Sequence, residues 1–118
     1  KNHPLTAHSH TNIGIVLRQK GDYEVAEWRY RKALRIQEAV KGKDDEDCAV
    51  SLTHLGEVLK RKGDYDGAIK SIKRAIKMRE KNLGMDHPVS AGSHLDLGQV
   101  YLKKRKFDQA LQEFRKAK

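Results

Sequence analysis

Residues 51–75 read SLTHLGEVLKRKGDYDGAIKSIKRA, and this stretch decides the fold. Its leucines recur at three- and four-residue steps, as one face of a helix requires: Leu52, Leu55 and Leu59. Gly63 and Asp64 come next, and they indicate the end of one helix and the start of another. Glycine accepts the left-handed backbone past a helix end, and aspartate caps the following helix. A second apolar stripe begins at Tyr65. The stretch therefore predicts two helices joined by a tight turn.

The same pattern returns when the sequence is shifted by 42 residues, so the chain holds three copies of this unit. The columns with one residue in every copy are Ala7/Ala49/Ala91, Ser9/Ser51/Ser93, Gly14/Gly56/Gly98, Val16/Val58/Val100, Lys20/Lys62/Lys104, Ala26/Ala68/Ala110 and Ala33/Ala75/Ala117. A three-way identity arises by chance at roughly one column in a few hundred, which excludes coincidence. An isolated pair could not bury its apolar stripe, so the copies must stack.

The apolar periodicity of the three copies sets the expected helix bounds. We expect helices at residues 4–19, 23–41, 46–61, 65–83, 88–103 and 107–118. The column Asn2, Asp44 and Asp86 offers a capping residue ahead of each first helix, and Pro4 and Pro88 follow where a first helical turn tolerates proline.

Small residues at repeated positions indicate close helix packing. Gly14, Gly56 and Gly98 fall in mid-helix, where glycine costs about 1 kcal/mol relative to alanine. We expect a close helix contact at each of them, with the second-helix alanines as its other side: Ala26, Ala68 and Ala110. In the third copy Arg105 replaces the turn glycine, so we expect it to enter left-handed backbone space.

Composition narrows the class of protein. The 118 residues are 37% hydrophobic and 35% charged, which suits a thin helical protein better than a globule with one large core. No stretch approaches the length of a membrane span. Cys48 is the only cysteine, which favours a reducing compartment, and we expect the cytoplasm. The net charge of +9 opens nucleic acid, an anionic membrane or acidic protein segments as partners, although a solvated helix face is the simpler interpretation of such scattered charges.

The repeated residues resemble the tetratricopeptide repeat over essentially the whole chain. The period of 42 and the stretch Asn82–Pro88, NLGMDHP, are similar to the longer repeats of kinesin light chains, although Asp45-Glu46 stands at the second junction in place of histidine-proline. The resemblance implies an all-α fold, a right-handed α-α superhelix of three helix-turn-helix units. The expected repeats are 4–41, 46–83 and 88–118, in one domain that we expect to belong to a longer array.

The resemblance also implies where a partner binds, because first helices of such arrays line a concave groove that holds an extended peptide or a partner helix. The polar side chains expected there, called the groove residues below, are Asn12, Arg18, Thr53, His54, Glu57, Lys60, Arg61, Asp96, Gln99 and Lys103. Arg18, Lys60, Arg61 and Lys103 would attract carboxylates, which predicts an acidic segment. For each residue the alternative is an ordinary solvated helix face.

Two specificities of the family can be compared with these positions. The clamp that grips a chaperone's C-terminal carboxylate uses lysine, asparagine and arginine, but its slots here hold Thr11, Ile15, His54, Gly92 and Asp96, which excludes it. Kinesin light chains carry groove asparagines on successive first helices. Asn12 matches this pattern, whereas His54 and Asp96 stand at the equivalent positions of the next two copies and do not. The sequence therefore predicts a binding groove without naming its cargo.

Three further interpretations stay open at the level of sequence. Trp28 shares a column with Lys70 and Gln112, so it is either an exposed contact hot spot or a side chain that packs on neighbouring stems or on a further repeat. The alternative function is weak binding of RNA or another polyanion to the basic surface. Weak end-to-end self-association is expected through Leu111 and Phe114 on the last helix.

No pattern in the sequence supports catalysis, a cofactor or a metal. The six histidines include His8 and His10, which point to different helix faces, and no cysteine or carboxylate set completes a metal site. The glycines lie at helix crossings and helix ends, where they form no phosphate-binding loop. The serines near histidines fall in the repeat column of Ser9, so we interpret them as packing residues. We expect a binding protein that is not an enzyme.

Overall fold

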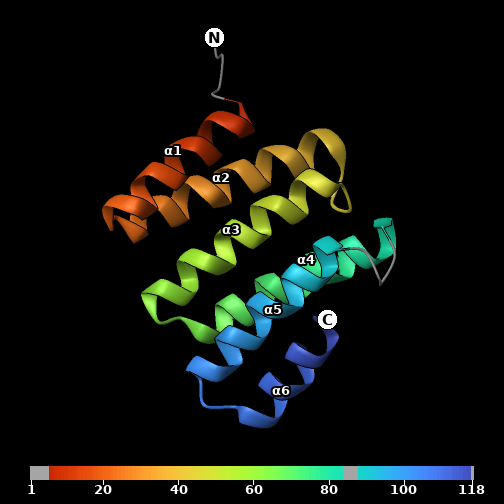
Figure 1. The fold of residues 1–118 in the computed structure, drawn as a ribbon. Helices are drawn as coiled ribbons and strands as arrows, with labels where there is room; N and C mark the ends of the chain where they lie inside the picture. Colours follow the sequence, from red (N-terminus) through yellow and green to blue (C-terminus); the bar gives the residue numbers. More distant parts are fainter. Residues whose placement is uncertain (1–5, 84–87, 118) are drawn as a thin grey trace.

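The computed structural model describes residues 6–83 and 88–117, and this part of the chain is helical without strands. Its helices are α1 (Ala7–Lys20), α2 (Tyr23–Lys41), α3 (Glu46–Lys62), α4 (Tyr65–Leu83), α5 (Pro88–Lys103) and α6 (Phe107–Lys116). They form three antiparallel pairs stacked along one direction, each pair contacting the next through α2 with α3 and α4 with α5 (Figure 1). The all-α superhelix expected from the sequence is confirmed.

The first helix begins later than predicted. It starts at Ala7 and not at residue 4, because the Thr6 hydroxyl accepts a hydrogen bond from the Ser9 amide at 3.2 Å and so caps the helix. Asn2 and Pro4, which we expected to cap and open this helix, lie outside the described residues.

In the second repeat the capping residue is Asp45, one position after the predicted Asp44. The Asp45 carboxylate accepts from the Asp47 amide at 2.9 Å, because the helix begins at Glu46 and only the adjacent residue reaches its free amides. Asp44 instead forms an ion pair of 2.8 Å with Lys81 of α4. The expected cap Asp86 lies outside the described residues, and Pro88 is the first residue of α5 as predicted.

The turns inside the repeats follow the glycine prediction. Gly21 and Gly63 end α1 and α3 with φ angles of 92° and 88°, in left-handed backbone. Arg105 occupies the same place after α5 with φ at 65°, so the prediction for this residue is confirmed. Asp64 caps α4, since its carboxylate accepts from the Gly67 amide at 3.0 Å.

The mid-helix glycines mark close helix contacts, but their partners differ from the prediction. A methyl group at Gly56 would lie 2.6 Å from the Ile72 side chain, whereas the nearest atom of Ala68 is its carbonyl oxygen at 3.5 Å. Gly14 and Gly98 are crowded in the same way by Tyr30 and Phe114, at 2.7 and 2.6 Å. The alanines are buried, yet the larger residue one turn further on fills the space each glycine leaves.

The core runs through all three pairs, and it thins at the last helix. The largest fully buried side chains are Tyr30, Leu55, Leu59 and Leu97. On α6, Leu111 is 51% exposed and Phe114 is partly buried. The end-to-end association expected through these two residues stays a prediction.

Candidate functional site

The groove residues lie on α1, α3 and α5, the first helices of the three pairs (Figure 1). Four of them are exposed: Asn12, Arg61, Gln99 and Lys103. The other six are partly buried: Arg18, Thr53, His54, Glu57, Lys60 and Asp96. Polar side chains that are half-buried on neighbouring helices are suited to contact a partner laid across them.

The centre of this surface holds a small charge network on α3. Glu57 accepts from Lys60 Nζ at 3.1 Å and from Arg61 Nε at 2.7 Å. Burial alone would raise the pKa of Glu57, but the hydrogen bonds from Arg61 and Lys60 outweigh it and hold this pKa below its usual value. The two cations that the sequence offered to an incoming carboxylate therefore share one carboxylate already.

Residues of all three first helices influence one another electrostatically. Burial, together with the nearby Glu57 carboxylate, raises the pKa of Asp96 on α5. Burial also lowers the pKa of His54, with further contributions from Arg18 on α1 and Arg79 on α4. These effects fall off with distance, so Arg18 of α1 lies near His54 of α3, and Asp96 of α5 lies near Glu57 of α3.

Arg79 is a contributor to this surface that the sequence analysis missed. It belongs to a second helix, α4, and is buried, yet its guanidinium donates to Ser93 at 2.9 Å, Thr53 at 3.3 Å and Glu46 at 3.2 Å. Thr53 also donates its hydroxyl to the Ala49 carbonyl at 2.9 Å, so it is turned toward the protein. The signal was an arginine within the apolar stripe of α4.

Three groove residues meet at a basic pocket of about 340 Å³. Lys60, Arg61 and Lys103 line it together with Tyr23 and Tyr65, the first residues of α2 and α4. The sequence analysis missed the tyrosines as site residues, because the equivalent position in the third copy holds Phe107, which favours an apolar packing role. The sequence feature that could have identified them is the hydroxyl group that Tyr23 and Tyr65 carry and Phe107 lacks.

Trp28 lies apart from the groove residues. Trp28 is 53% exposed, and its ring packs edge-on against His10, with ring centroids 6.1 Å apart. The Arg29 guanidinium lies 5.3 Å from the Trp28 ring centre. Trp28 is thus partly packed on neighbouring side chains, and a role as a hot spot stays a prediction.

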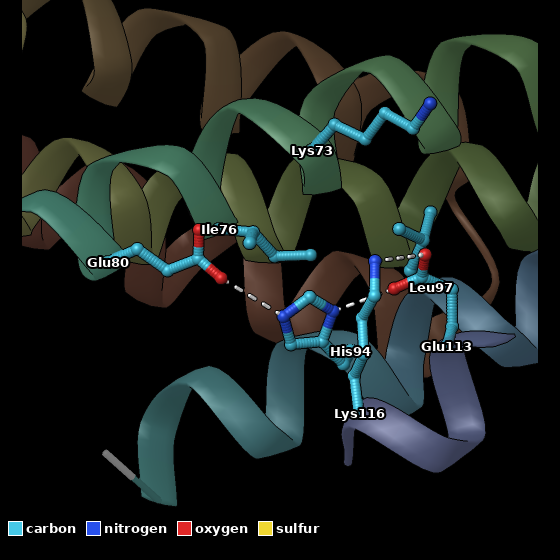
Figure 2. A pocket seen from close by; sticks show the side chains of 7 residues that line it. All are labelled: Lys73, Ile76, Glu80, His94, Leu97, Glu113 and Lys116. Carbon is cyan, nitrogen blue, oxygen red and sulfur yellow. Dashed lines mark hydrogen bonds and ion pairs between the residues drawn. The ribbon is translucent and has the colours of Figure 1, made fainter. Parts of the chain in front are cut away.

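Another cavity, of about 460 Å³, lies between α4, α5 and α6 and contains none of the groove residues. Figure 2 shows the His94 ring between two carboxylates, with Nδ1 2.7 Å from Glu113 and Nε2 3.2 Å from Glu80. Lys116 forms an ion pair of 3.6 Å with Glu113. The sequence analysis identified His94 only as one of six histidines and did not foresee this cluster.

These polar clusters do not form a metal centre. Each nitrogen of His94 faces a different carboxylate, and within residues 6–83 and 88–117 no group of three histidine, cysteine or acidic side chains is arranged to hold a metal ion. Ser51 and Ser93 are buried, in agreement with packing residues. None of the described helices has the length and apolar character needed to cross a membrane.

Comparison with known families accounts for the repeat. Two family models described as tetratricopeptide repeat match the chain, one over residues 6–47 and the other over residues 47–118. The chain belongs to the tetratricopeptide repeat family. No curated protein matches it significantly.

Solved structures share the fold of this tetratricopeptide repeat chain. BtubC (BKLC) from P. vanneervenii is 25% identical with a TM-score of 0.87, covering 94% of this chain and 44% of its own. A kinesin light chain-like protein with nearly identical TPR-like repeats from Podosopora anserina is 16% identical, with a TM-score of 0.83 over 93% and 52%. A variant of that protein is 17% identical with a TM-score of 0.85, covering 99% of this chain and 55% of its own. The chain therefore spans about half the length of these proteins and resembles kinesin light chain repeats.

Proposed function

We propose that the chain is a protein-interaction module whose groove residues bind an acidic peptide or partner helix. Tetratricopeptide repeats generally mediate protein–protein interaction, which supports the class of function. The observation that carries the proposal is the convergence of Lys60 and Arg61 of α3 with Lys103 of α5 on one pocket. The effect of Arg18 of α1 on the pKa of His54 of α3 supports it. The proposed setting is a reducing compartment such as the cytoplasm, where the buried and unpaired Cys48 would stay reduced.

The charge of the surface supports an acidic segment. Arg18, Lys60, Arg61 and Lys103 contribute four positive charges among the groove residues, against Glu57 and Asp96. Glu57 lies in the Lys60–Arg61 network, and the pKa of Asp96 is raised by burial and by Glu57. The side chains at the two ends, Arg18 and Lys103, form no ion pair within the described part of the chain.

Reversing the charges of Lys60 and Arg61 together tests the proposal. The probe is a pool of labelled short peptides with several fixed glutamates and randomised flanking positions, and the readout is fluorescence anisotropy. We expect binding to weaken about tenfold or more, which corresponds to about 1.4 kcal/mol. The matched control reverses Lys70 and Lys77, two exposed lysines of α4.

The control variant should bind the pool as the unmodified chain does, and both variants should keep their helicity by circular dichroism. If the Lys70/Lys77 variant loses as much affinity as the Lys60/Arg61 variant, general charge attraction explains the binding. If the Lys60/Arg61 variant binds normally, the groove residues are not the site.

The alternative, binding of RNA or another polyanion, is favoured only by the net charge of +9. Many cations outside the groove residues are already paired with acids, as in Arg74–Glu38, Arg31–Glu27, Lys62–Glu27, Lys104–Asp66 and Lys81–Asp44. Titration with a single-stranded RNA oligonucleotide at two salt concentrations separates the functions. We expect weak binding that falls steeply with salt, because phosphate contacts release counterions.

A further inference from the structure

The basic pocket combines features that a helix end alone does not explain. Lys60 and Arg61 belong to the last turn of α3, and Lys103 ends α5. Cations in such positions stabilise the negative end of each helix dipole, which accounts for them one at a time. It does not account for their convergence, from two helices, on one cavity of about 340 Å³ that two tyrosines also line.

The charge of this pocket matches a divalent anion. Three cations face it, and Glu57 offsets one of their charges through its bonds to Lys60 and Arg61. Two positive charges remain, whereas a phosphate monoester carries about −1.5 to −2 at neutral pH. A single carboxylate would neutralise only one of them. The pocket therefore suits a phosphate group better than a glutamate side chain.

Two of the three cationic groups, those of Lys60 and Arg61, have a carboxylate partner before any ligand arrives. The Lys60 side chain is only 16% exposed, and Glu57 fixes both Lys60 Nζ and Arg61 Nε. Glu57 and the neighbouring Tyr23 hydroxyl raise the pKa of the Arg61 guanidinium, which keeps it charged. One lysine N–H and one guanidinium N–H are taken by Glu57, so further donors on both groups remain for an incoming oxygen atom.

We infer that this pocket binds the phosphate of a phosphorylated serine, threonine or tyrosine in a peptide that occupies the groove residues. Arg61, Lys60 and Lys103 would hold the phosphate oxygens, and the phenol hydroxyls of Tyr23 and Tyr65 are further donors at the pocket wall. The inference rests on the proposed function, and it names phosphorylation as the feature that the site recognises.

The test compares three probes by anisotropy or calorimetry: a phosphoserine peptide pool with acidic flanks, the same pool with serine, and inorganic phosphate. We expect phosphorylation to tighten binding at least about tenfold, since charge-assisted hydrogen bonds to phosphate are strong. Arg61→Met with Lys103→Met should abolish this gain. Lys70→Met with Lys77→Met, on α4 outside the pocket, is the matched control and should retain it.

A milder variant guards against a folding defect. Tyr65→Phe makes the change that the chain itself carries at Phe107, so it removes one hydroxyl and leaves the ring. We expect it to reduce the gain from phosphorylation severalfold and to keep the helicity of the chain, measured by circular dichroism. A gain that is untouched in both the Arg61/Lys103 and Tyr65 variants would show that the phosphate lies elsewhere, and it would overturn the inference.

Failure of the inference is distinguishable from failure of the proposed function. Equal affinity for the phosphoserine and serine pools, both weakened by reversing Lys60 and Arg61, would overturn the phosphate pocket and support the groove. Absence of binding to either pool would overturn both. Inorganic phosphate that binds as tightly as the phosphopeptide would identify a free-anion site and would contradict recognition of a peptide.

Discussion

The second and third repeats have the same backbone plan but different chemistry where each meets the repeat before it. At the first junction, Leu52 of α3 and Ser71 of α4 line one pocket together with residues of α2. At the equivalent place in the second junction, His94 and Glu113 lie 2.7 Å apart on α5 and α6. The comparison teaches that the repeat period fixes the position of a side chain and leaves its chemical role open.

A second pair of equivalent contacts, Gln37 with Ser51 and Arg79 with Ser93, also differs in chemistry between the two junctions. Gln37 accepts a hydrogen bond from the Ser51 hydroxyl at 2.6 Å in the first junction. In the second, Arg79 takes the place of Gln37 and donates to Ser93, while also reaching Glu46. The first junction thus has a neutral contact, whereas the second has a buried charge, Arg79, which links two repeats and contacts the groove residue Thr53.

Replacing Arg79 with the glutamine of the first junction should produce the largest effect. Arg79→Gln removes the cation near Glu46 and Asp96, and hydrogen bonds to charged groups contribute about 1.5 to 3 kcal/mol each. We expect the free energy of unfolding to fall by about 2 kcal/mol, measured by urea denaturation. A loss no larger than that of Gln37→Ala would show that the charged junction contributes no more to stability than the neutral one, and it would contradict this ranking.

The mid-helix glycines give the next largest difference. Alanine at Gly56 meets Ile72, which is 3% exposed and packed on all sides, whereas alanine at Gly98 meets Phe114, which is only partly buried. Overpacking costs about 1 to 3 kcal/mol, and alanine regains about 1 kcal/mol of helix propensity. We expect Gly56→Ala to destabilise the chain and Gly98→Ala to change its stability much less, in denaturation curves. Equal losses would contradict this ranking.

Restoring a glycine to the third turn should stabilise the chain. Arg105 has φ at 65°, where Gly63 has 88° in the second repeat, and a side chain in left-handed backbone costs about 1 to 2 kcal/mol. We expect Arg105→Gly to raise the free energy of unfolding by about 1 kcal/mol. A loss of stability would mean that the Arg105 guanidinium, 5.7 Å from the Phe107 ring centre, contributes more than the backbone costs.

The smallest effect should depend on pH. Burial, with Arg29 and Lys32 nearby, lowers the pKa of His10, so the unfolded chain binds more protons and stability falls as pH drops through about 6.5. His10→Leu introduces the residue that Leu52 supplies in the second repeat. We expect it to flatten this pH dependence, with little change at pH 8 and a gain near pH 5.5. If the His10→Leu variant and the unmodified chain differ in thermal stability by the same amount at pH 8 and at pH 5.5, His10 is not the source of this pH dependence.

Much of the fold was readable because the repeat shows the same signals three times. Leucine spacing and the Gly63–Asp64 turn were enough to place the helices. The predicted cap was Asp44 and the observed cap is Asp45. Two adjacent aspartates are equally able to cap a helix, and the repeat period does not distinguish them. The contacts of the mid-helix glycines depend on how deeply the two helices approach, which the spacing of residues does not give.

The candidate site was predictable in its positions and less so in its pairings. The bonds of Glu57 to Lys60 and Arg61 follow the three- and four-residue spacing of a helix surface and could have been read from the sequence. The reach of Arg79 to Ser93, and the proximity of Asp96 to Glu57, arise from stacking between repeats. No pattern within one repeat carries that information.

Photo-crosslinking of the acidic peptide pool to the chain, followed by mass spectrometry, tests the central claim most directly, because it reports the surface on which a partner lies. We predict that crosslinks concentrate on α1, α3 and α5 near Asn12, His54 and Gln99, and disappear when Lys60 and Arg61 are reversed. Crosslinks concentrated on the exposed lysines of α4, Lys70 and Lys77, and unchanged by that reversal, would contradict the account.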